Sequence, residues 1–195
     1  MSALIYIHGF LSSPQSHKAV QTGAWLAREH TEVAFVAPAL TPYPGQTRQQ
    51  LDALISRLGQ QPIYLMGSSM GGFWATYLAE QYDLPAVLIN PACEPMRLMP
   101  GYLHQTLHNY HTPDSYRLDE SHLAELQDAD TNGIRRPANY WVMVQTGDET
   151  LDYRKALEKY AGCRQLVEEG GDHGFQNFEQ HLPECWAFYQ NFYQG

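Results

Sequence analysis

The sequence predicts an α/β fold in which helices flank a mostly parallel sheet of about six strands. Short apolar runs alternate with longer amphipathic segments along most of the 195 residues, as in chains whose parallel strands are joined by helical crossovers. Four of the short runs are almost continuously apolar, which is typical of strands covered on both faces. The length fits one domain or two very small ones, and we expect a single domain over residues 1–195.

Each predicted strand is a short apolar run followed by a turn, and proline or glycine marks many of these turns. The segments between the strands are long enough for helices, and Leu51, Leu54, Ile55 and Leu58 show the helical spacing of apolar residues. The predicted strands span residues 3–7, 33–36, 63–66, 86–90, 140–145 and 164–168. The predicted helices span residues 16–30, 46–58, 70–81, 152–160 and 175–193.

The segment between Pro91 and Pro137 interrupts this alternation because it contains no strand-like run. It is much longer than the connections of about 2–6 residues that usually join strands and helices. We therefore expect a small helical insertion at about residues 92–137, which would form a cap over one end of the sheet.

Composition and charge exclude several classes of protein. Hydrophobic residues make up 44% of the chain and aromatic residues 12%, which argues against disorder. The net charge of −9 would repel a nucleic acid, and no apolar run approaches the ~18 residues of a membrane span. The three cysteines form no C-x-x-C pattern and indicate neither a disulfide framework nor a zinc site. These observations favour a soluble cytoplasmic domain.

A candidate nucleophile follows the third predicted strand, where residues 67–71 read G-S-S-M-G before a helical segment. G-x-S-x-G between a strand and a helix presents the hydroxyl of its serine on a sharp turn, and the glycines avoid collisions with the neighbouring elements. The alternative is a glycine-serine loop that only turns the chain. The position of the motif favours Ser69 as a nucleophile.

A nucleophilic serine needs a base and a carboxylate, which should follow it in the order acid, then histidine, each in a loop after a strand. His173 lies in a glycine-flanked loop after the last predicted strand; the alternative is a surface histidine. Asp148 and Asp152 both follow the preceding strand. We favour Asp148 because it is nearer the strand end, whereas Asp152 is well placed to cap the next helix.

The oxyanion of an acyl-transfer reaction is normally bound by backbone amides. One amide should be that of Met70, directly after the nucleophile, and the other should come from the loop after the first strand. That loop contains His8, Gly9 and Phe10, so Phe10 is the second candidate donor. His8 is an alternative base, but its position at the strand end favours a role in orienting the loop.

Several blocks together resemble the α/β-hydrolase superfamily, and specifically the YqiA-like bacterial esterases. The resemblance implies a three-layer α/β-hydrolase fold, with the nucleophile at Ser69, the acid at Asp148 and the base at His173. It covers most of the chain and is weakest between Pro91 and Pro137. The blocks are Y-I-H-G-F-x-S-S-P at 6–14, P-x-L-x-P-Y-P at 38–44, G-S-S-M-G-G at 67–72, N-P-A at 90–92, Q-T-G-D-E-x-L-D-Y-R at 145–154 and E-G-G-D-H-x-F at 169–175.

The functional hypothesis is a serine hydrolase that cleaves small-molecule carboxylic esters or acyl thioesters through an acyl-enzyme intermediate. This chemistry requires no metal or organic cofactor. Two alternatives remain open: a hydrolase-fold binding protein without turnover, and an amidase or peptidase. The oligomeric state is not specified by the sequence.

The histidines of the insertion suggest a further alternative. His104 and His108 would share one face of a helix, near His111 and Asp114, and histidines spaced i, i+4 can bind zinc. The sequence has no H-E-x-x-H glutamate, so surface histidines are favoured.

The acidic residues are concentrated after residue 93. Anionic substrates should therefore be disfavoured, unless Arg97, Arg135 or Arg136 offsets the negative charge.

Overall fold

The computed structural model describes residues 2–131 and 133–194 and contains a six-stranded parallel sheet. The strand order is β2-β1-β3-β4-β7-β8, and every neighbouring pair is parallel. The strands are β1 (Ser2–Ile7), β2 (Val33–Val36), β3 (Ile63–Ser68), β4 (Ala86–Ile89), β7 (Tyr140–Gln145) and β8 (Arg164–Glu168). This confirms the predicted fold class.

Five helices outside the insertion connect or follow the strands of the sheet. They are α1 (His17–Glu29), α2 (Pro44–Leu58), α3 (Met70–Tyr82), α6 (Tyr153–Lys159) and α7 (Leu182–Gln194). Across residues 2–131 and 133–194, no helix has both the length and the apolar character that crossing a membrane would require.

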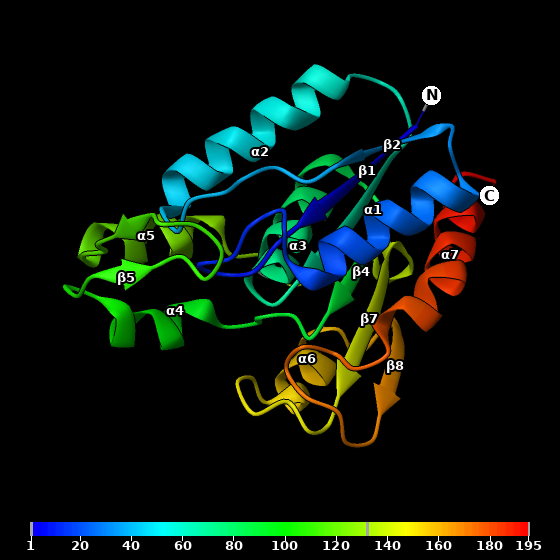
Figure 1. Cartoon of the computed structure of the whole chain (residues 1–195). Helices are drawn as coiled ribbons and strands as arrows, with labels where there is room; N and C mark the ends of the chain where they lie inside the picture. The colour runs from blue at the N-terminus through cyan, green and yellow to red at the C-terminus, as the bar shows by residue number, and fades with distance from the viewer. Residues whose placement is uncertain (1, 132, 195) are drawn as a thin grey trace.

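The helices cover both faces of the sheet (Figure 1). Side chains of α2, α3 and α6 pack on one face, and those of α1 and α7 pack on the other. Along β1, Ile5 and Ile7 point into the first of these cores, whereas Leu4 and Tyr6 point into the second. Because both faces are covered, every position of a central strand can be apolar, which explains the continuous apolar runs of the sequence.

The strand order places a switch point between β1 and β3. From β1 the chain moves to β2 on one side, and it then returns to add β3 on the other side of β1. Loops that leave the carboxyl ends of strands in opposite directions leave a crevice between them, where open α/β sheets bind ligands. The loops after β1 and β3 carry Phe10 and Ser69, so the fold brings these two residues to the same edge.

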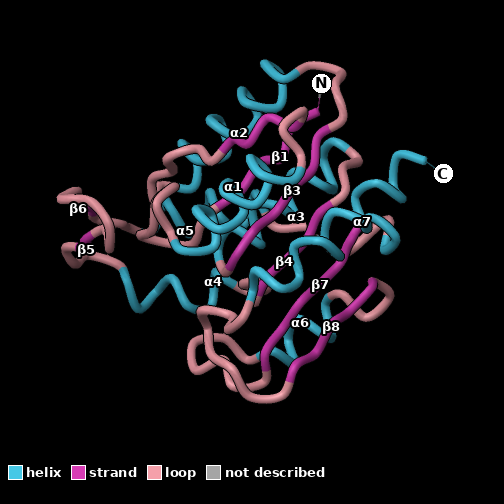
Figure 2. Tube along the Cα trace, turned by 45° about the vertical axis from the view of Figure 1, so that its right-hand side comes forward, coloured by secondary structure: helices cyan, strands magenta, loops and turns pink. Residues whose placement is uncertain are grey.

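The insertion differs from the helical prediction. It contains α4 (Pro95–Leu98), a 3₁₀ turn η1 (Met99–Tyr102) and α5 (Glu120–Ala129), followed by η2 (Pro137–Asn139), but also a small antiparallel ladder. In this ladder β5 (Leu107–His108) pairs with β6 (Ser115–Tyr116), at the edge of the molecule in Figure 2. Strands of two residues are too short to show an alternating pattern, and so they could not be predicted from the sequence.

The C-terminal helix begins later than predicted. Residues 175–177 form a loop, in which Phe175 and Asn177 have positive φ angles of 60° and 59°, and a 3₁₀ turn η3 (Phe178–His181) precedes α7. Pro183 lies in the first turn of α7, where a missing backbone N–H costs no hydrogen bond. In a helix that began at residue 175, the same proline would interrupt the interior.

Candidate active site

Ser69 occupies a strained turn between β3 and α3. Its backbone has φ 57° and ψ −121°, a conformation that residues with a side chain rarely adopt. The Ser69 N–H donates to Ile89 O at 3.0 Å, which ties the turn to β4. A Cβ atom at Gly71 would overlap the carbonyl group of Ile7, and one at Gly67 would overlap that of Gly71. The two glycines therefore allow β3, α3 and β1 to meet closely around the serine.

Replacing Gly71 with alanine is expected to lower the free energy of unfolding by about 3 kcal/mol or more, because the new methyl group must displace the β1 backbone. Gly101→Ala is the matched control, since nothing lies within 4 Å of a Cβ atom at Gly101. It should change the stability by only about 0.5 kcal/mol. Urea denaturation followed by tryptophan fluorescence measures both, and equal stabilities of the two variants would contradict this account of the turn.

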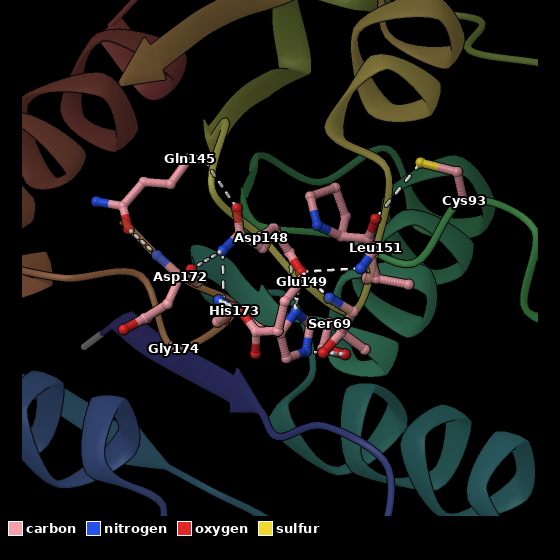
Figure 3. Close-up of polar contacts among 12 residues, drawn as sticks. Ser69, Cys93, Gln145, Asp148, Glu149, Leu151, Asp172, His173 and Gly174 are labelled. Carbon is pink, nitrogen blue, oxygen red and sulfur yellow. Dashed lines mark hydrogen bonds and ion pairs between the residues drawn. The ribbon is translucent and has the colours of Figure 1, made fainter. Parts of the chain in front are cut away.

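The structure brings the three sequence-predicted polar residues together at the carboxyl edge of the sheet (Figure 3). Ser69 follows β3, Asp148 follows β7 and His173 follows β8. His173 Nε2 lies 3.0 Å from Ser69 Oγ, and His173 Nδ1 lies 2.8 Å from Asp148 Oδ2. The result is a continuous chain of hydrogen bonds from a hydroxyl to a carboxylate.

Asp148 is held as a carboxylate by its neighbours. Burial alone would raise its pKa, but hydrogen bonds from His173 and from the backbone N–H groups of Leu151 and Thr150 outweigh burial and lower the pKa below its ordinary value. Both of these N–H groups donate to Oδ1 at 2.8 Å, and the imidazole Nδ1 lies 2.8 Å from Oδ2 and 3.0 Å from Oδ1. An ionised Asp148 keeps a proton on His173 Nδ1, so Nε2 is free to accept the Ser69 proton.

Asp152, the other candidate carboxylate, has a different place. Its Oδ1 accepts a hydrogen bond from the Arg154 N–H at 3.1 Å, as the N-cap of α6. Glu149, between the two aspartates, accepts from the His173 backbone N–H at 3.0 Å. The acidic loop thus holds the imidazole through Asp148 and the backbone beside it through Glu149.

Two polar residues that the sequence analysis did not single out hold the histidine loop. Gln145 Oε1 accepts from the backbone N–H groups of Asp172 and Gln176 at 3.2 and 2.8 Å. Asn90 Nδ2 donates to the carbonyl groups of Asp172 and His173 at 3.0 and 3.2 Å. Both side chains are at the ends of otherwise apolar buried strands, and a single polar residue at such a position was the signal that could have identified them.

The two candidate oxyanion donors line one cavity with Ser69. Within the described residues, the backbone N–H groups of Phe10 and Met70 donate to no protein acceptor. His8 orients the first of these loops: its Nε2 accepts from the Leu40 N–H at 3.1 Å, and its Nδ1 lies 2.9 Å from Gly9 O. His8 therefore has the loop-orienting position that the sequence favoured over that of a base.

The cavity above Ser69 has a volume of about 330 Å³, within the range of small-molecule sites. The insertion supplies one apolar side, through Pro95, Leu98, Met99 and Tyr102. The ring of Tyr102 packs edge-on against Phe10, with 5.2 Å between the ring centroids. The insertion thus contacts the loop after β1 and forms part of the wall of the cavity that contains Ser69.

The histidines of the insertion do not form the arrangement required for the metal hypothesis. His104 lies in a turn and its Nε2 contacts Glu120 Oε1 at 2.7 Å, whereas His108 belongs to β5. Because a turn and a strand replace the expected helix, the i, i+4 relation no longer applies. Among residues 2–131 and 133–194, no cluster of three or more histidine, cysteine or acidic side chains could hold a metal ion.

The fold and the position of the site define the chain as an α/β-hydrolase-fold protein. It is similar to alpha/beta hydrolase domain-containing protein 10 from mouse, with a TM-score of 0.74 and 16% identity over 99% of this chain and 90% of that one. It is also similar to Est1E from Butyrivibrio proteoclasticus, with a TM-score of 0.70 and 16% identity over 99% and 87% of the two chains.

The sequence specifies the family more narrowly. The model of an uncharacterised protein family, UPF0227, matches residues 3–190, and the chain belongs to this family. A UPF0227 protein of Serratia proteamaculans is 27% identical over 191 residues, which cover 95% of this chain and 97% of the relative. The UPF0227 protein YcfP of Salmonella arizonae is 24% identical over 193 residues, with the same coverage. These relatives are bacterial, in agreement with the family that the sequence blocks resemble.

Proposed function

We propose that the protein is a serine hydrolase that cleaves small-molecule carboxylic esters or acyl thioesters. The observation that carries the proposal is the chain of hydrogen bonds from Ser69 through His173 to Asp148, at 3.0 and 2.8 Å. Ser69 and His173 line a cavity large enough for a small acyl group. Three residues from three separate loops meet in the order and geometry that nucleophilic acyl transfer requires.

In the proposed reaction, Ser69 Oγ attacks the carbonyl carbon while its proton passes to His173 Nε2. Asp148 stabilises the imidazolium that forms, and the backbone N–H groups of Phe10 and Met70 donate to the oxyanion. His173 then returns the proton to the leaving alcohol or thiol, and Ser69 keeps the acyl group. Water, deprotonated by His173, attacks the acyl-enzyme and regenerates the serine.

A cytoplasmic location remains a prediction from the sequence.

A rate profile across 4-nitrophenyl esters and acyl thioesters of graded chain length tests the proposal. The apolar wall formed by Leu98, Met99 and Tyr102 predicts a rise of kcat/KM with acyl length, until the chain fills the cavity. Each added methylene that is buried contributes about 0.8 kcal/mol, or about fourfold in kcat/KM. A flat profile at the rate of Ser69→Ala would contradict both the activity and the acyl pocket.

A further inference from the structure

Lys18 brings a positive charge into the cavity that contains Ser69. It lies in the first turn of α1 and lines the cavity with Ser69, His173 and Gly174. Its Nζ donates to Gly174 O at 2.6 Å, directly after the proposed base. No residue of the described ranges 2–131 and 133–194 forms an ion pair with Lys18 within 4.0 Å.

The hydrogen bonds of this ammonium group are incompletely satisfied. An ammonium has three N–H donors, and Gly174 O is the one protein acceptor that we find for it in the described residues. Burial lowers the pKa of Lys18 to about 8, although the charges of Asp172 and Asp148 act in the opposite direction. At neutral pH the group is therefore a half-buried cation, and two of its N–H donors remain for a ligand.

The residues around Lys18 form the polar side of the cavity. Ser12, Ser16 and His17 line this side, and the Ser16 Oγ atom is buried without a hydrogen-bond partner in the described residues. Ser16 is also the residue before α1, where the positive end of the helix dipole favours an anion. The insertion adds the apolar side chains of Pro95, Leu98 and Met99 to the lining. The cavity therefore fits a molecule with one anionic and one apolar portion.

The three arginines considered in the sequence analysis do not supply this charge. Arg97 pairs with Glu94 at 3.2 Å and Arg135 with Glu80 at 2.8 Å, and Arg136 pairs with Asp83. None of the three lines the cavity. The sequence analysis did not consider Lys18, which is distant in sequence from the acidic loops whose charges act on it.

We propose that Lys18 forms an anion subsite beside Ser69, and that the substrates are esters or thioesters that carry a carboxylate or phosphate group as well as an apolar portion. This inference rests on the proposed hydrolysis at Ser69. The anionic group can belong to the acyl portion or to the alcohol portion of the ester. The oxygen atoms of the anionic group accept hydrogen bonds from the remaining N–H donors of the Lys18 ammonium.

Matched ester pairs test the subsite. Mono-4-nitrophenyl succinate carries a carboxylate on the acyl portion, 3-carboxy-4-nitrophenyl butanoate carries one on the alcohol portion, and 4-nitrophenyl butanoate is the neutral reference. The quantity compared is the ratio of kcat/KM for an anionic ester to kcat/KM for the neutral ester. For one of the two anionic esters, the one whose carboxylate reaches Lys18, we expect this ratio to fall about tenfold in Lys18→Met. Lys18→Arg should keep more of this preference than Lys18→Met, and the exposed control Lys155→Met should keep all of it.

The ratio separates recognition of charge from positioning of the base. If Lys18 only holds the loop through Gly174, Lys18→Met lowers the rates of neutral and anionic esters equally and the ratio stays constant. That result would overturn the inference without affecting the proposed hydrolysis. The ratio is also expected to fall between pH 7 and 9, as the ammonium with a pKa of about 8 loses its charge. The carboxylates whose charges act on Lys18 are Asp172 and Asp148, and Asp148 stays ionised over this range because its pKa is lowered. The ratio cancels any pH dependence that the two esters of a pair share.

Binding to Ser69→Ala tests the subsite without turnover. We expect monomethyl succinate to shift backbone amide NMR signals around Lys18, and methyl butanoate to shift them much less. The difference should disappear in the double variant Ser69→Ala/Lys18→Met. Equal shifts with the two ligands would exclude the anion subsite. If the wild type hydrolyses no ester but binds the anion selectively, the proposed activity is rejected and the anion subsite is retained.

Discussion

Replacement of Ser69 by alanine is expected to lower kcat for ester hydrolysis by about 10⁶-fold, because no other nucleophile occupies its position on the turn after β3. His173→Ala should cost about as much. The double variant should cost little more than either single variant, since the two residues act in one step. Initial rates with 4-nitrophenyl esters measure the effect, at enzyme concentrations high enough to detect residual turnover.

Ser56→Ala is the matched control for this experiment. Ser56 lies on the exposed side of α2, and its hydroxyl donates to Asp52 O at 2.9 Å, so its loss should leave kcat unchanged. Full activity of Ser69→Ala would exclude Ser69 as the nucleophile. Losses that multiply in the Ser69/His173 double variant would show that the two residues act independently, against the hydrogen-bonded arrangement.

Replacement of Asp148 by asparagine is expected to lower kcat by about 10⁴-fold. Asparagine fills the same space, but its amide can donate to His173 Nδ1 and so favours the tautomer with a proton on Nε2. That tautomer cannot accept the Ser69 proton. Because the pKa of Asp148 is lowered, the carboxylate of the wild type stays ionised at neutral pH, and its protonation should lower activity only in acid.

Asp152→Asn is the comparison that distinguishes the two aspartates. Asparagine is as good an N-cap as aspartate, so the variant should keep both the stability of α6 and the activity. Rates and thermal unfolding of the two variants, measured side by side, decide between them. A large loss of activity in Asp152→Asn with full activity in Asp148→Asn would reverse the assignment of the acid.

Much of the fold could be predicted because the central strands are buried on both faces. Ile5 and Leu4 lie in different cores, yet both are apolar, and this gives the continuous runs that identify parallel strands. The positions of Ser69 and Asp148 could be predicted because each follows such a run, whereas His173 was identified by its glycine-flanked loop after the last strand, β8, which is partly exposed. The carboxyl ends of parallel strands meet at one edge, so sequence order alone brings the three loops together.

The remaining features depend on contacts between distant parts of the chain. Lys18 reaches the site only because α1 lies next to the loop after β8, and Gly174 is 156 residues away. The loop at residues 175–177 continues the apolar pattern of a helix, but Gln145 holds its backbone in another conformation. The β5–β6 ladder is closed by a turn in which Asn109 Oδ1 accepts from the His111 and Thr112 N–H groups. No local periodicity encodes such contacts.

Covalent labelling distinguishes a Ser69 nucleophile that His173 activates from a serine without catalytic use. A fluorophosphonate reacts with an activated serine and leaves a stable adduct that mass spectrometry locates on a peptide. We expect one adduct per chain, on Ser69, that is absent from Ser69→Ala and nearly absent from His173→Ala. Two results would contradict an activated Ser69. One is a wild-type protein that stays unlabelled, as expected of a hydrolase-fold binding protein without turnover. The other is a label on Ser69 that persists undiminished in His173→Ala.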